Sequence, residues 1–489
     1  MSAAAARLLR SGGNAFDASV AAGFASTVAE PVLTSLGGGG FLLAYESTGR
    51  VRLFDFFVNT PGCGREGAQR ASHFVPVTVR FAASEQVFNV GRGSIAVPGT
   101  LCGLLHVHEK LGRRPLAEVL TPAIELAHDG VTVNAHQAYF LDILYPILRL
   151  GEESRHLFTR NGGPLRCGDR LRNPDLARFL EALPEDGGRR LYEGELASQL
   201  GRLLSRDGSL MTEDLARYRV VEREPLAFRY REHQVLGNPP PAFGGLLLCT
   251  SLARLARESL GSLGWGSARH LTLLIEGQRE VDRLREEWGA TAPTLSPDDL
   301  AGRSPPRRRA RGGTTHLCVA DAEGNVASMT ASNGEGSSVV VPGAGIMLNN
   351  MLGEDDLHPE GFHAGTAGER IASMMSPSLV LRAGEPILAL GSGGSKRIRS
   401  AILQVMTQVL DFGRELQVAV DAPRIHWDGE TVQIEPGFPE SAIAALERRW
   451  PVNRWSDREV YFGGVQAVQP GRCGAADPRR GGAVERVEL

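Results

Sequence analysis

A threonine that directly follows a run of arginine and glycine is the first candidate for chemistry in this 489-residue chain. The run ends at Gly313, and Thr314 opens a strand-like segment. A threonine hydroxyl is a weak nucleophile that needs an adjacent base. If the Gly313–Thr314 bond were cut, Thr314 would carry an α-amine with a pKa of about 7.7–8.0. One residue would then supply both nucleophile and base.

The same hydroxyl could make that cut. It could attack the carbonyl of Gly313 to give an ester that water then hydrolyses, and the missing Cβ of Gly313 eases the strained backbone that such an attack requires. The bare Thr-Thr pair, however, usually reflects only the β-propensity of threonine at the start of a strand.

A glycine-rich turn at 391–395, GSGGS, could stabilise the oxyanion that such an attack creates. It lies between an apolar strand and a helix, where successive backbone amides can converge on one point. The turn would equally suit a phosphate, although the sequence has neither the G-x-G-x-x-G spacing nor a P-loop there. A glycine-rich turn of this kind is more often structural.

The loop 330–337, TASNGEGS, combines hydroxyls with one carboxylate between two expected strands, and a solvated loop is its default interpretation. His106 and His108 lie two apart on a helical stretch and do not share a face for a metal. We expect His316 to be a packed, hydrogen-bonded residue. No G-x-S-x-G elbow occurs, which disfavours a serine hydrolase.

The elements that must position these residues fall into two halves. Helices are expected over 3–10, 14–29, 100–149, 174–183, 194–206 and 265–288, with Asn14 as an N-cap, and a hairpin over 41–58. Residues 289–313 are rich in Pro, Arg, Ser and Gly and are expected to form an exposed linker. Strands over 314–333 and 343–350, a hairpin over 376–394 and helices over 395–413 and 440–449 follow. This order predicts an α+β fold with helix-covered sheets.

Composition limits the possible partners. The net charge of −3 gives no reason to expect nucleic acid or an anionic membrane surface. The six scattered cysteines form no metal-ligand or disulfide pattern, so we expect neither a zinc site nor a disulfide framework. Without a signal pattern the protein is expected in the cytoplasm, with export only if the true start lies upstream.

Ordered blocks along nearly the whole chain resemble the gamma-glutamyltranspeptidase family of Ntn hydrolases. The early blocks are GGNAFDA at 12–18, GGGGF at 37–41 and VPGT at 97–100. The later and most specific order is TTH, D-x-x-G-N, T-x-S, G-I-x-L-N-N, SMMSP and GSGGS, followed by DPRRGG at 477–482. The resemblance implies a four-layer αββα sandwich that processes itself, with a large subunit of residues 1–313 and a small subunit of residues 314–489 that stay together as a heterodimer. It implies no metal and no organic cofactor.

The resemblance also implies roles for individual residues. Thr314 matches the processed nucleophile, Ser332 the hydroxyl that assists it, and Gly393 with Gly394 the oxyanion pair. The implied substrate contacts are Asn333 and Glu335 in the loop, Glu354 or Asp355 for an α-amine, and Ser373 for a carboxylate, beside Met374 where the family has a second serine.

This sequence departs from the family pattern at the residue that binds the substrate's carboxylate. The family's carboxylate-binding arginine follows an Asp-Phe pair, but here Phe57 occupies that position. A phenyl ring cannot form the bidentate pair that arginine makes with a carboxylate. The segment between Leu352 and Ser373 is also short for the family's lid. We therefore expect relaxed or altered recognition of the substrate's head group.

Three functions follow from the resemblance. The first is a γ-glutamyltransferase or glutathione hydrolase that forms an acyl-enzyme from a small γ-glutamyl amide and passes it to water or an amine. The second keeps the chemistry with another substrate, as a cephalosporin/glutaryl-type acylase or other amidase. The third is an unprocessed, non-catalytic homologue.

Overall fold

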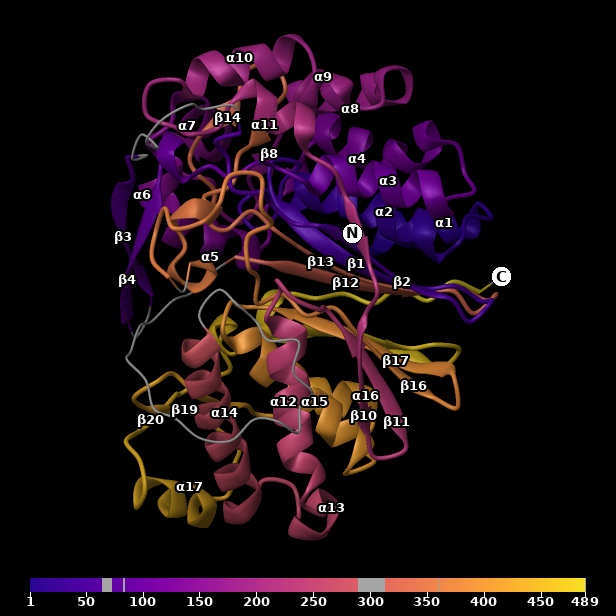
Figure 1. The fold of residues 1–489 in the computed structure, drawn as a ribbon, viewed down its shortest axis with the longest axis vertical. Coiled ribbons are helices and arrows are strands. Elements are labelled where there is room, and N and C mark those ends of the chain that lie inside the picture. Colours follow the sequence, from indigo (N-terminus) through magenta and orange to yellow (C-terminus); the bar gives the residue numbers. More distant parts are fainter. Residues whose placement is uncertain (64–72, 82–83, 289–312, 359, 489) are drawn as a thin grey trace.

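The computed structural model of the protein describes residues 1–63, 73–81, 84–288, 313–358 and 360–488. The expected linker over 289–313 lies outside this part of the chain, apart from Gly313. Two antiparallel sheets lie face to face at the centre of the molecule, and helices lie on the outer side of each (Figure 1). The mixed helix and strand content agrees with the sequence prediction.

The first sheet joins strands from both halves of the chain. Its order is β12 (Thr315–Ala320), β13 (Val326–Ser332), β1 (Gly39–Tyr45), β2 (Val51–Phe56) and β9 (Val221–Arg223). The hairpin β1–β2 was predicted, and β13 pairs with β1 from Gly39↔Ser332 to Tyr45↔Val326. The edge strand β12 begins one residue after Thr314.

The second sheet packs against the first through β17 and β21. Its order is β10 (Leu226–Tyr230), β11 (His233–Gly237), β16 (Ser378–Arg382), β17 (Glu385–Gly393), β21 (Gly464–Gln469) and β22 (Cys473–Ala475). The predicted hairpin over 376–394 is β16–β17.

Strand β1 shows why the sheets are covered on both faces. Phe41 and Leu43 belong to the core between the two sheets, whereas Leu42 and Ala44 belong to the core under the first helical layer. Alternate side chains of a strand point to opposite faces, so an all-apolar strand requires cover on both.

Helix α2 (Ala15–Ala29) lies over the first sheet and contacts β12 and β13. The side chain of Asn14 accepts from the backbone amide of Asp17, and Asp17 accepts from that of Asn14, which confirms the predicted N-cap. The neighbouring helices are α1 (Ser2–Arg10), α3 (Thr100–Leu111), α4 (Leu116–Asp129) and α8 (Pro174–Asp186).

Helix α15 (Arg397–Leu410) lies over the second sheet and contacts β17 and β21. The others on this side are α12 (Gly244–Ala256), α13 (Leu260–Leu263), α14 (Ala268–Trp288), α16 (Leu416–Asp421) and α17 (Glu440–Glu447). A small sheet of β18 (Ile425–Trp427), β19 (Val432–Ile434) and β20 (Val452–Arg454) lies near α14.

The helical stretch expected over 100–149 is four helices: α3, α4, α5 (Ala135–Ile143) and α6 (Tyr145–Leu148). Gly112 and Gly130 end the first two. The strand expected over 343–350 is reduced to β15 (Ile346–Met347), paired with β14 (Val340–Val341). The remaining elements are the helices α7 (Glu152–Phe158), α9 (Arg189–Tyr192), α10 (Glu195–Leu204) and α11 (Thr212–Arg217), the short pairs β5 (Val131–Thr132) with β8 (Arg170–Leu171) and β6 (Thr159–Arg160) with β7 (Gly163–Pro164), and the hairpin of β3 (Val75–Phe81) and β4 (Ser84–Val90).

Candidate active site

The hydroxyl of Thr314 lies against the peptide carbonyl that precedes it. Thr314 is 5% exposed, and its Oγ1 donates to the carbonyl oxygen of Gly313 at 2.7 Å. Ser332, the last residue of β13, donates a second hydrogen bond to the same oxygen. Two hydroxyl donors on one buried carbonyl polarise it.

The loop after β13 holds Gly313 from its other side. The backbone amide of Gly313 donates to Oε1 of Glu335 at 2.9 Å, and the amide of Glu335 donates to the side chain of Asn350 at 2.9 Å. The amide of Gly334 donates to Oγ of Ser332 at 3.1 Å. The loop 330–337, whose default interpretation was a solvated loop, is therefore buried, and its hydrogen bonds hold Gly313 in place.

The glycine turn after β17 lies beside Thr314. A Cβ on Gly393 would be 2.2 Å from the carbonyl oxygen of Thr314, so no larger residue fits at this position. Gly394 has a φ of +121°, a conformation that side chains rarely adopt. Arg480 donates from Nη1 to the same carbonyl of Thr314 at 3.2 Å, and burial lowers the pKa of its guanidinium to about 10.

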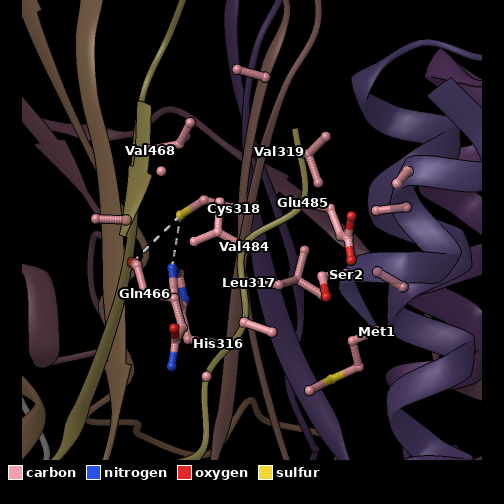
Figure 2. Close-up of a pocket in the computed structure, with 18 of the residues that line it drawn as sticks. Met1, Ser2, His316, Leu317, Cys318, Val319, Gln466, Val468, Val484 and Glu485 are labelled. Atoms are coloured by element: carbon pink, nitrogen blue, oxygen red, sulfur yellow. Dashed lines mark hydrogen bonds between the residues drawn. The ribbon is translucent and has the colours of Figure 1, made fainter. Parts of the chain in front are cut away.

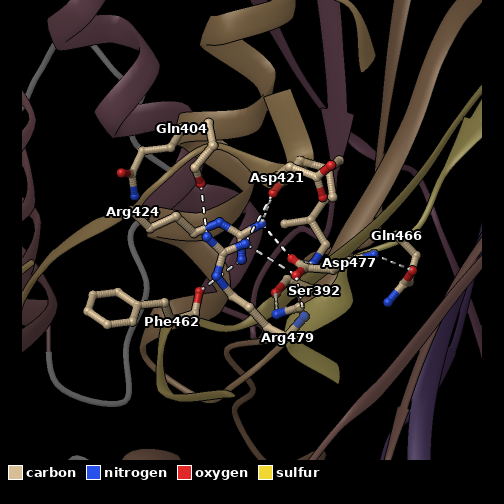
Figure 3. Close-up of polar contacts among 12 residues, drawn as sticks. Ser392, Gln404, Asp421, Arg424, Phe462, Gln466, Asp477 and Arg479 are labelled. Carbon is tan, nitrogen blue, oxygen red and sulfur yellow. Dashed lines mark hydrogen bonds and ion pairs between the residues drawn. The ribbon is translucent and has the colours of Figure 1, made fainter. Parts of the chain in front are cut away.

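A buried polar network supports this turn (Figure 3). Oγ of Ser392 donates to the carbonyl of Gly393 at 2.8 Å and accepts from the amide of Gly464 at 3.0 Å. Behind it, Asp477 accepts from Arg424 at 2.5 Å and from Arg479 at 3.2 Å. Burial acts to raise the pKa of Asp477, but the two guanidinium groups outweigh it and hold the pKa below its ordinary value. Asp477 also accepts from the amide of Val465 in β21, the strand that pairs with β17, so the network lies directly behind the turn.

A small cavity, which we call the nucleophile cavity, opens beside Thr314 and Ser332. Most of its wall is apolar, and its polar groups are two further hydroxyls and two carboxylates. Among the described residues no cation lines it. Its other lining residues are Phe57, Met351, Glu354, Asp356, Leu357, Ser373, Met374, Met375, Ser395 and Ile398.

Of the acidic residues expected to contact substrate, Glu354 lines the nucleophile cavity and Asp355 does not. A 3-10 turn over Asp355–Leu357 leaves Asp355 exposed and turns Asp356 inward. Burial raises the pKa of Glu354 well above its ordinary value, and the charges of Glu335 and Asp356 add to this effect. Oε1 of Glu354 is buried without a hydrogen-bond partner among the described residues.

Asp356 connects this turn to the glycine turn, and sequence reasoning did not single it out. It accepts a hydrogen bond from Oγ of Ser395, and Nζ of Lys396 lies 3.3 Å from its Oδ1. No local pattern distinguishes Asp356 from Asp355; the turn that points one inward forms only against the folded body.

Phe57 fills the position where the resemblance implied an arginine. It is 1% exposed, stacks on Phe41 with ring centroids 5.6 Å apart, and lines the nucleophile cavity. The guanidinium of Arg370 lies nearby, but it donates to the backbone carbonyl of Phe57 and pairs with Asp55 at 3.2 Å. Arg370 does not line the cavity, so it does not replace the missing cation.

The other residues predicted to contact substrate fall into two groups, those that line the nucleophile cavity and those that do not. Ser373 and Met374 line the nucleophile cavity. Asn333 is fully buried away from it, and its amide donates to the carbonyl of Leu348 at 3.5 Å. Glu335 lines a different cavity, on the side of Gly313.

A larger cavity follows β12 and contains a cysteine and a histidine (Figure 2). Nε2 of His316 lies 3.1 Å from Sγ of Cys318, and its Nδ1 lies 2.8 Å from Oγ1 of Thr330, which confirms that His316 is packed and hydrogen-bonded. Burial lowers the pKa of His316 to about 3 and raises that of Cys318 to about 12. Both groups are therefore neutral near pH 7, and the pair is no thiolate nucleophile.

Within the described part of the chain, no group of three or more His, Cys, Asp or Glu side chains could hold a metal ion. Nor is any helix there long and apolar enough to cross a membrane.

Comparison with known proteins agrees with this geometry. The family model described as Gamma-glutamyltranspeptidase matches residues 1–290 and 282–487. A glutathione hydrolase proenzyme of Escherichia coli is 30% identical over 96% of this chain and 87% of its own length. An acylase ACY 1 proenzyme of a Pseudomonas species is 34% identical over 92% of this chain and 84% of its own. The crystal structure of a cephalosporin acylase from Bacillus halodurans superposes with a TM-score of 0.85 at 27% identity, covering 99% of this chain and 94% of that one.

A two-sheet body with a threonine hydroxyl held on the preceding carbonyl, together with these matches, defines an Ntn-type hydrolase. The chain belongs to the gamma-glutamyltranspeptidase family. Its relatives include glutathione hydrolases and acylases at similar sequence identity, so belonging to this family does not identify the substrate.

Proposed function

We propose that the chain cuts itself between Gly313 and Thr314 and then uses Thr314 as an N-terminal nucleophile on small amides. The layered body would be the family's four-layer αββα sandwich, with a large subunit of residues 1–313 and a small subunit of residues 314–489. The observation that carries the proposal is the position of the Thr314 hydroxyl, 2.7 Å from the carbonyl oxygen of Gly313 while Ser332 donates to that same oxygen.

Processing would follow from these contacts. Oγ1 of Thr314 attacks the carbonyl carbon of Gly313, its proton passes to the departing amide nitrogen, and an ester replaces the peptide bond. Water then hydrolyses the ester, leaving a carboxylate on Gly313 and a free α-amine on Thr314. The carbonyl oxygen carries the developing negative charge, which the hydroxyl of Ser332 stabilises.

Catalysis would repeat the attack on an external amide. The α-amine of Thr314 accepts the hydroxyl proton while Oγ1 forms the acyl ester, and it returns a proton to the leaving amine. Water or a second amine then attacks the ester and restores the hydroxyl. Gly393 and Gly394, beside Thr314, are the proposed source of the oxyanion contacts.

The nucleophile cavity supports an acyl group that carries an amine and no carboxylate. An ionised carboxylate buried in this cavity would be strongly unfavourable, because no cation among the described lining residues replaces its hydration and Lys396, 3.3 Å from Asp356, does not line the cavity. An ammonium group would instead satisfy the unpartnered oxygen of Glu354. Both the γ-glutamyl α-carboxylate and the glutaryl carboxylate lack a partner here.

Self-cleavage is tested by the state of the purified protein. We expect two fragments on a denaturing gel, with threonine as the first residue of the smaller one, and a single band of 52.5 kDa for Thr314→Ala. Thr315→Ala is the matched control, because the Thr315 hydroxyl contacts Glu30 and not Gly313; it should still be cut. A single uncut band for the parent protein would refute the proposal and favour a non-catalytic homologue.

Substrate class is tested with four 4-nitroanilides that differ only in the head group of the acyl chain. The 4-aminobutyryl compound has an amine, the glutaryl compound a carboxylate, the γ-glutamyl compound both, and the butyryl compound neither. We expect the highest kcat/KM with 4-aminobutyryl. Faster cleavage of γ-glutamyl would identify a γ-glutamyltransferase, and faster cleavage of glutaryl an acylase of that type; either result would overturn the proposed head-group choice.

A Phe57→Arg variant provides the converse experiment, with Phe57→Leu as its control. A guanidinium at this position can pair with a carboxylate in the nucleophile cavity. The ratio of kcat/KM for γ-glutamyl over 4-aminobutyryl anilide should rise by about tenfold or more with arginine, as a charge-assisted hydrogen bond allows, and should stay unchanged with leucine.

A further inference from the structure

A second cavity meets the scissile bond from the side of Gly313. Four aromatic side chains line it, and we call it the ring-lined cavity: Tyr139, Phe140, Trp455 and Tyr461. The rings of Trp455 and Tyr461 stack with centroids 4.9 Å apart, and Tyr139 meets Phe140 edge to face at 5.6 Å. Such a wall suits a flat, apolar group.

Two of the cavities that border the Gly313–Thr314 bond lie on its two sides, and the larger cavity that follows β12 also reaches Thr314. Thr314 and Ser332 line the nucleophile cavity, whereas Gly313 and Glu335 line the ring-lined cavity. They have no lining residue in common. An amide has two halves, one on each side of the bond that is cut, so two cavities, one lined by Gly313 and the other by Thr314, fit one half each.

Two of the ionisable side chains that line the ring-lined cavity, Arg480 and Glu335, contact the scissile pair directly; Arg397 and Glu459 line the cavity as well. Arg480 lines the cavity and donates from Nη1 to the carbonyl of Thr314, while its buried Nε has no hydrogen-bond partner among the described residues. Glu335 is 3% exposed; its Oε1 accepts from the amide of Gly313, and its Oε2 is likewise without a partner there. A guanidinium that lines the cavity and has an unpartnered nitrogen favours an anionic ligand group.

Processing would open this cavity toward the nucleophile. While the Gly313–Thr314 bond is intact, Gly313 forms part of the wall between the cavity and Thr314. Once the bond is cut, Gly313 is free to leave, and its hydrogen bond to Glu335 is released. The ring-lined cavity would then border the new α-amine, which is the group that returns a proton to the leaving amine.

We propose that the ring-lined cavity is the subsite for the amine half of the substrate, and that it takes a flat, aromatic amine bearing a carboxylate. The rings hold the flat group and Arg480 pairs with the carboxylate. This inference rests on the proposed function, because it assigns the leaving or accepting amine of that same reaction.

The kinetic test compares two amides with the same 4-aminobutyryl chain, a 4-nitroanilide and a 3-carboxy-4-nitroanilide. We expect the carboxylated anilide to have a KM about tenfold lower. In Arg480→Gln this preference should fall to near unity. In Tyr139→Leu the KM for both anilides should rise about threefold to tenfold, because a ring contact is lost.

Tyr145→Leu is the matched control. Tyr145 is a half-buried tyrosine on the next helix, α6, whose hydroxyl donates to the carbonyl of Gly162, and it does not line the cavity. Its KM values should match those of the parent protein. Self-cleavage into two fragments shows in each variant that the body is folded around Thr314.

A binding measurement separates this inference from the proposed function. Titration calorimetry with the free amines 5-amino-2-nitrobenzoate and 4-nitroaniline needs no turnover. Tighter binding of the carboxylated amine, lost in Arg480→Gln, supports the subsite even if neither anilide is hydrolysed. Equal binding of the two amines, or an unchanged KM in Tyr139→Leu, would overturn the subsite while leaving the hydrolase intact.

Discussion

At the scale of single residues, the site is a set of contacts on one peptide bond. Thr314, Ser332 and Glu335 all bind Gly313, and Arg480 binds the carbonyl one residue later. Sequence reasoning could single out Thr314, Ser332 and Glu335, because all three lie within 22 residues of Gly313 in one segment that is rich in motifs. Arg480 comes from 166 residues away, and only the fold brings it to Thr314.

Removing the hydroxyl of Ser332 should slow processing without stopping it. Ser332→Ala takes away one of two donors to the Gly313 carbonyl, and a lost oxyanion donor reduces such rates by about a hundredfold to a thousandfold. The measurement is the time course of band conversion on a denaturing gel. Ser337→Ala is the control, since this buried hydroxyl of the same loop donates to Leu348 instead. Equal rates for Ser332→Ala and the parent protein would exclude the role of Ser332.

The carboxyl of Glu335 should make the stability of the protein depend on pH. Burial raises its pKa above the ordinary value of 4.5, so the folded state holds a proton that the unfolded state releases. The free energy of unfolding therefore falls as pH rises above about 4.5, as proton linkage requires. Glu335→Gln keeps an acceptor for the amide of Gly313 and removes the titration.

Thermal unfolding from about pH 5 to about pH 9 measures this effect. The melting temperature of Glu335→Gln should decline less steeply with pH than that of the parent protein. Glu323→Gln, at an exposed carboxyl paired with Arg113, should not reduce that decline. If Glu335→Gln and the parent protein had the same slope, Glu335 would not be the group that titrates.

At the scale of elements, the site is built where β12, β13 and β17 end or begin. The sequence predicted these strands and the capped helix α2, because alternation and capping are local patterns. It did not predict the 3-10 turn over Asp355–Leu357 or the strands β10 and β11. Strands β10 and β11 contact α12, β11 also pairs with β16, and Asp356 of the turn accepts from Ser395; β16 and Ser395 are distant in the sequence from these elements, so no local pattern indicates those contacts.

The glycine turn after β17 should tolerate no side chain at Gly393. A Cβ there would lie 2.2 Å from the carbonyl oxygen of Thr314 and 3.1 Å from its carbonyl carbon, so the backbone at the start of β12 would have to shift. A displacement of about 1 Å at a nucleophile lowers rates about a hundredfold. Gly393→Ala should therefore accumulate as uncut precursor.

Gly163→Ala provides the comparison for that variant. A Cβ on Gly163, in the short strand β7, would meet nothing within 4 Å, so cleavage should be normal. Circular dichroism of both variants shows whether the fold is kept. Normal processing of Gly393→Ala would mean that the turn does not set the position of Thr314.

At the scale of the whole molecule, both sheets combine strands from either side of Gly313. In the first sheet β13 pairs with β1, and in the second β16 pairs with β11. The core between the sheets likewise takes residues from both halves, such as Phe41 and Leu390. The proposed subunits are therefore two parts of one core rather than two domains in contact.

Cleavage should consequently leave a single particle. Because both sheets and the core between them are shared, separation would expose core side chains of both subunits. The two fragments should elute together in size-exclusion chromatography at the position of the uncut Thr314→Ala protein. They should separate only in denaturant, in one cooperative transition that tryptophan fluorescence and far-ultraviolet circular dichroism report at the same midpoint. Fragments that part in ordinary buffer, or two distinct transitions, would contradict a common core, because each half would then be stable without the strands it borrows from the other.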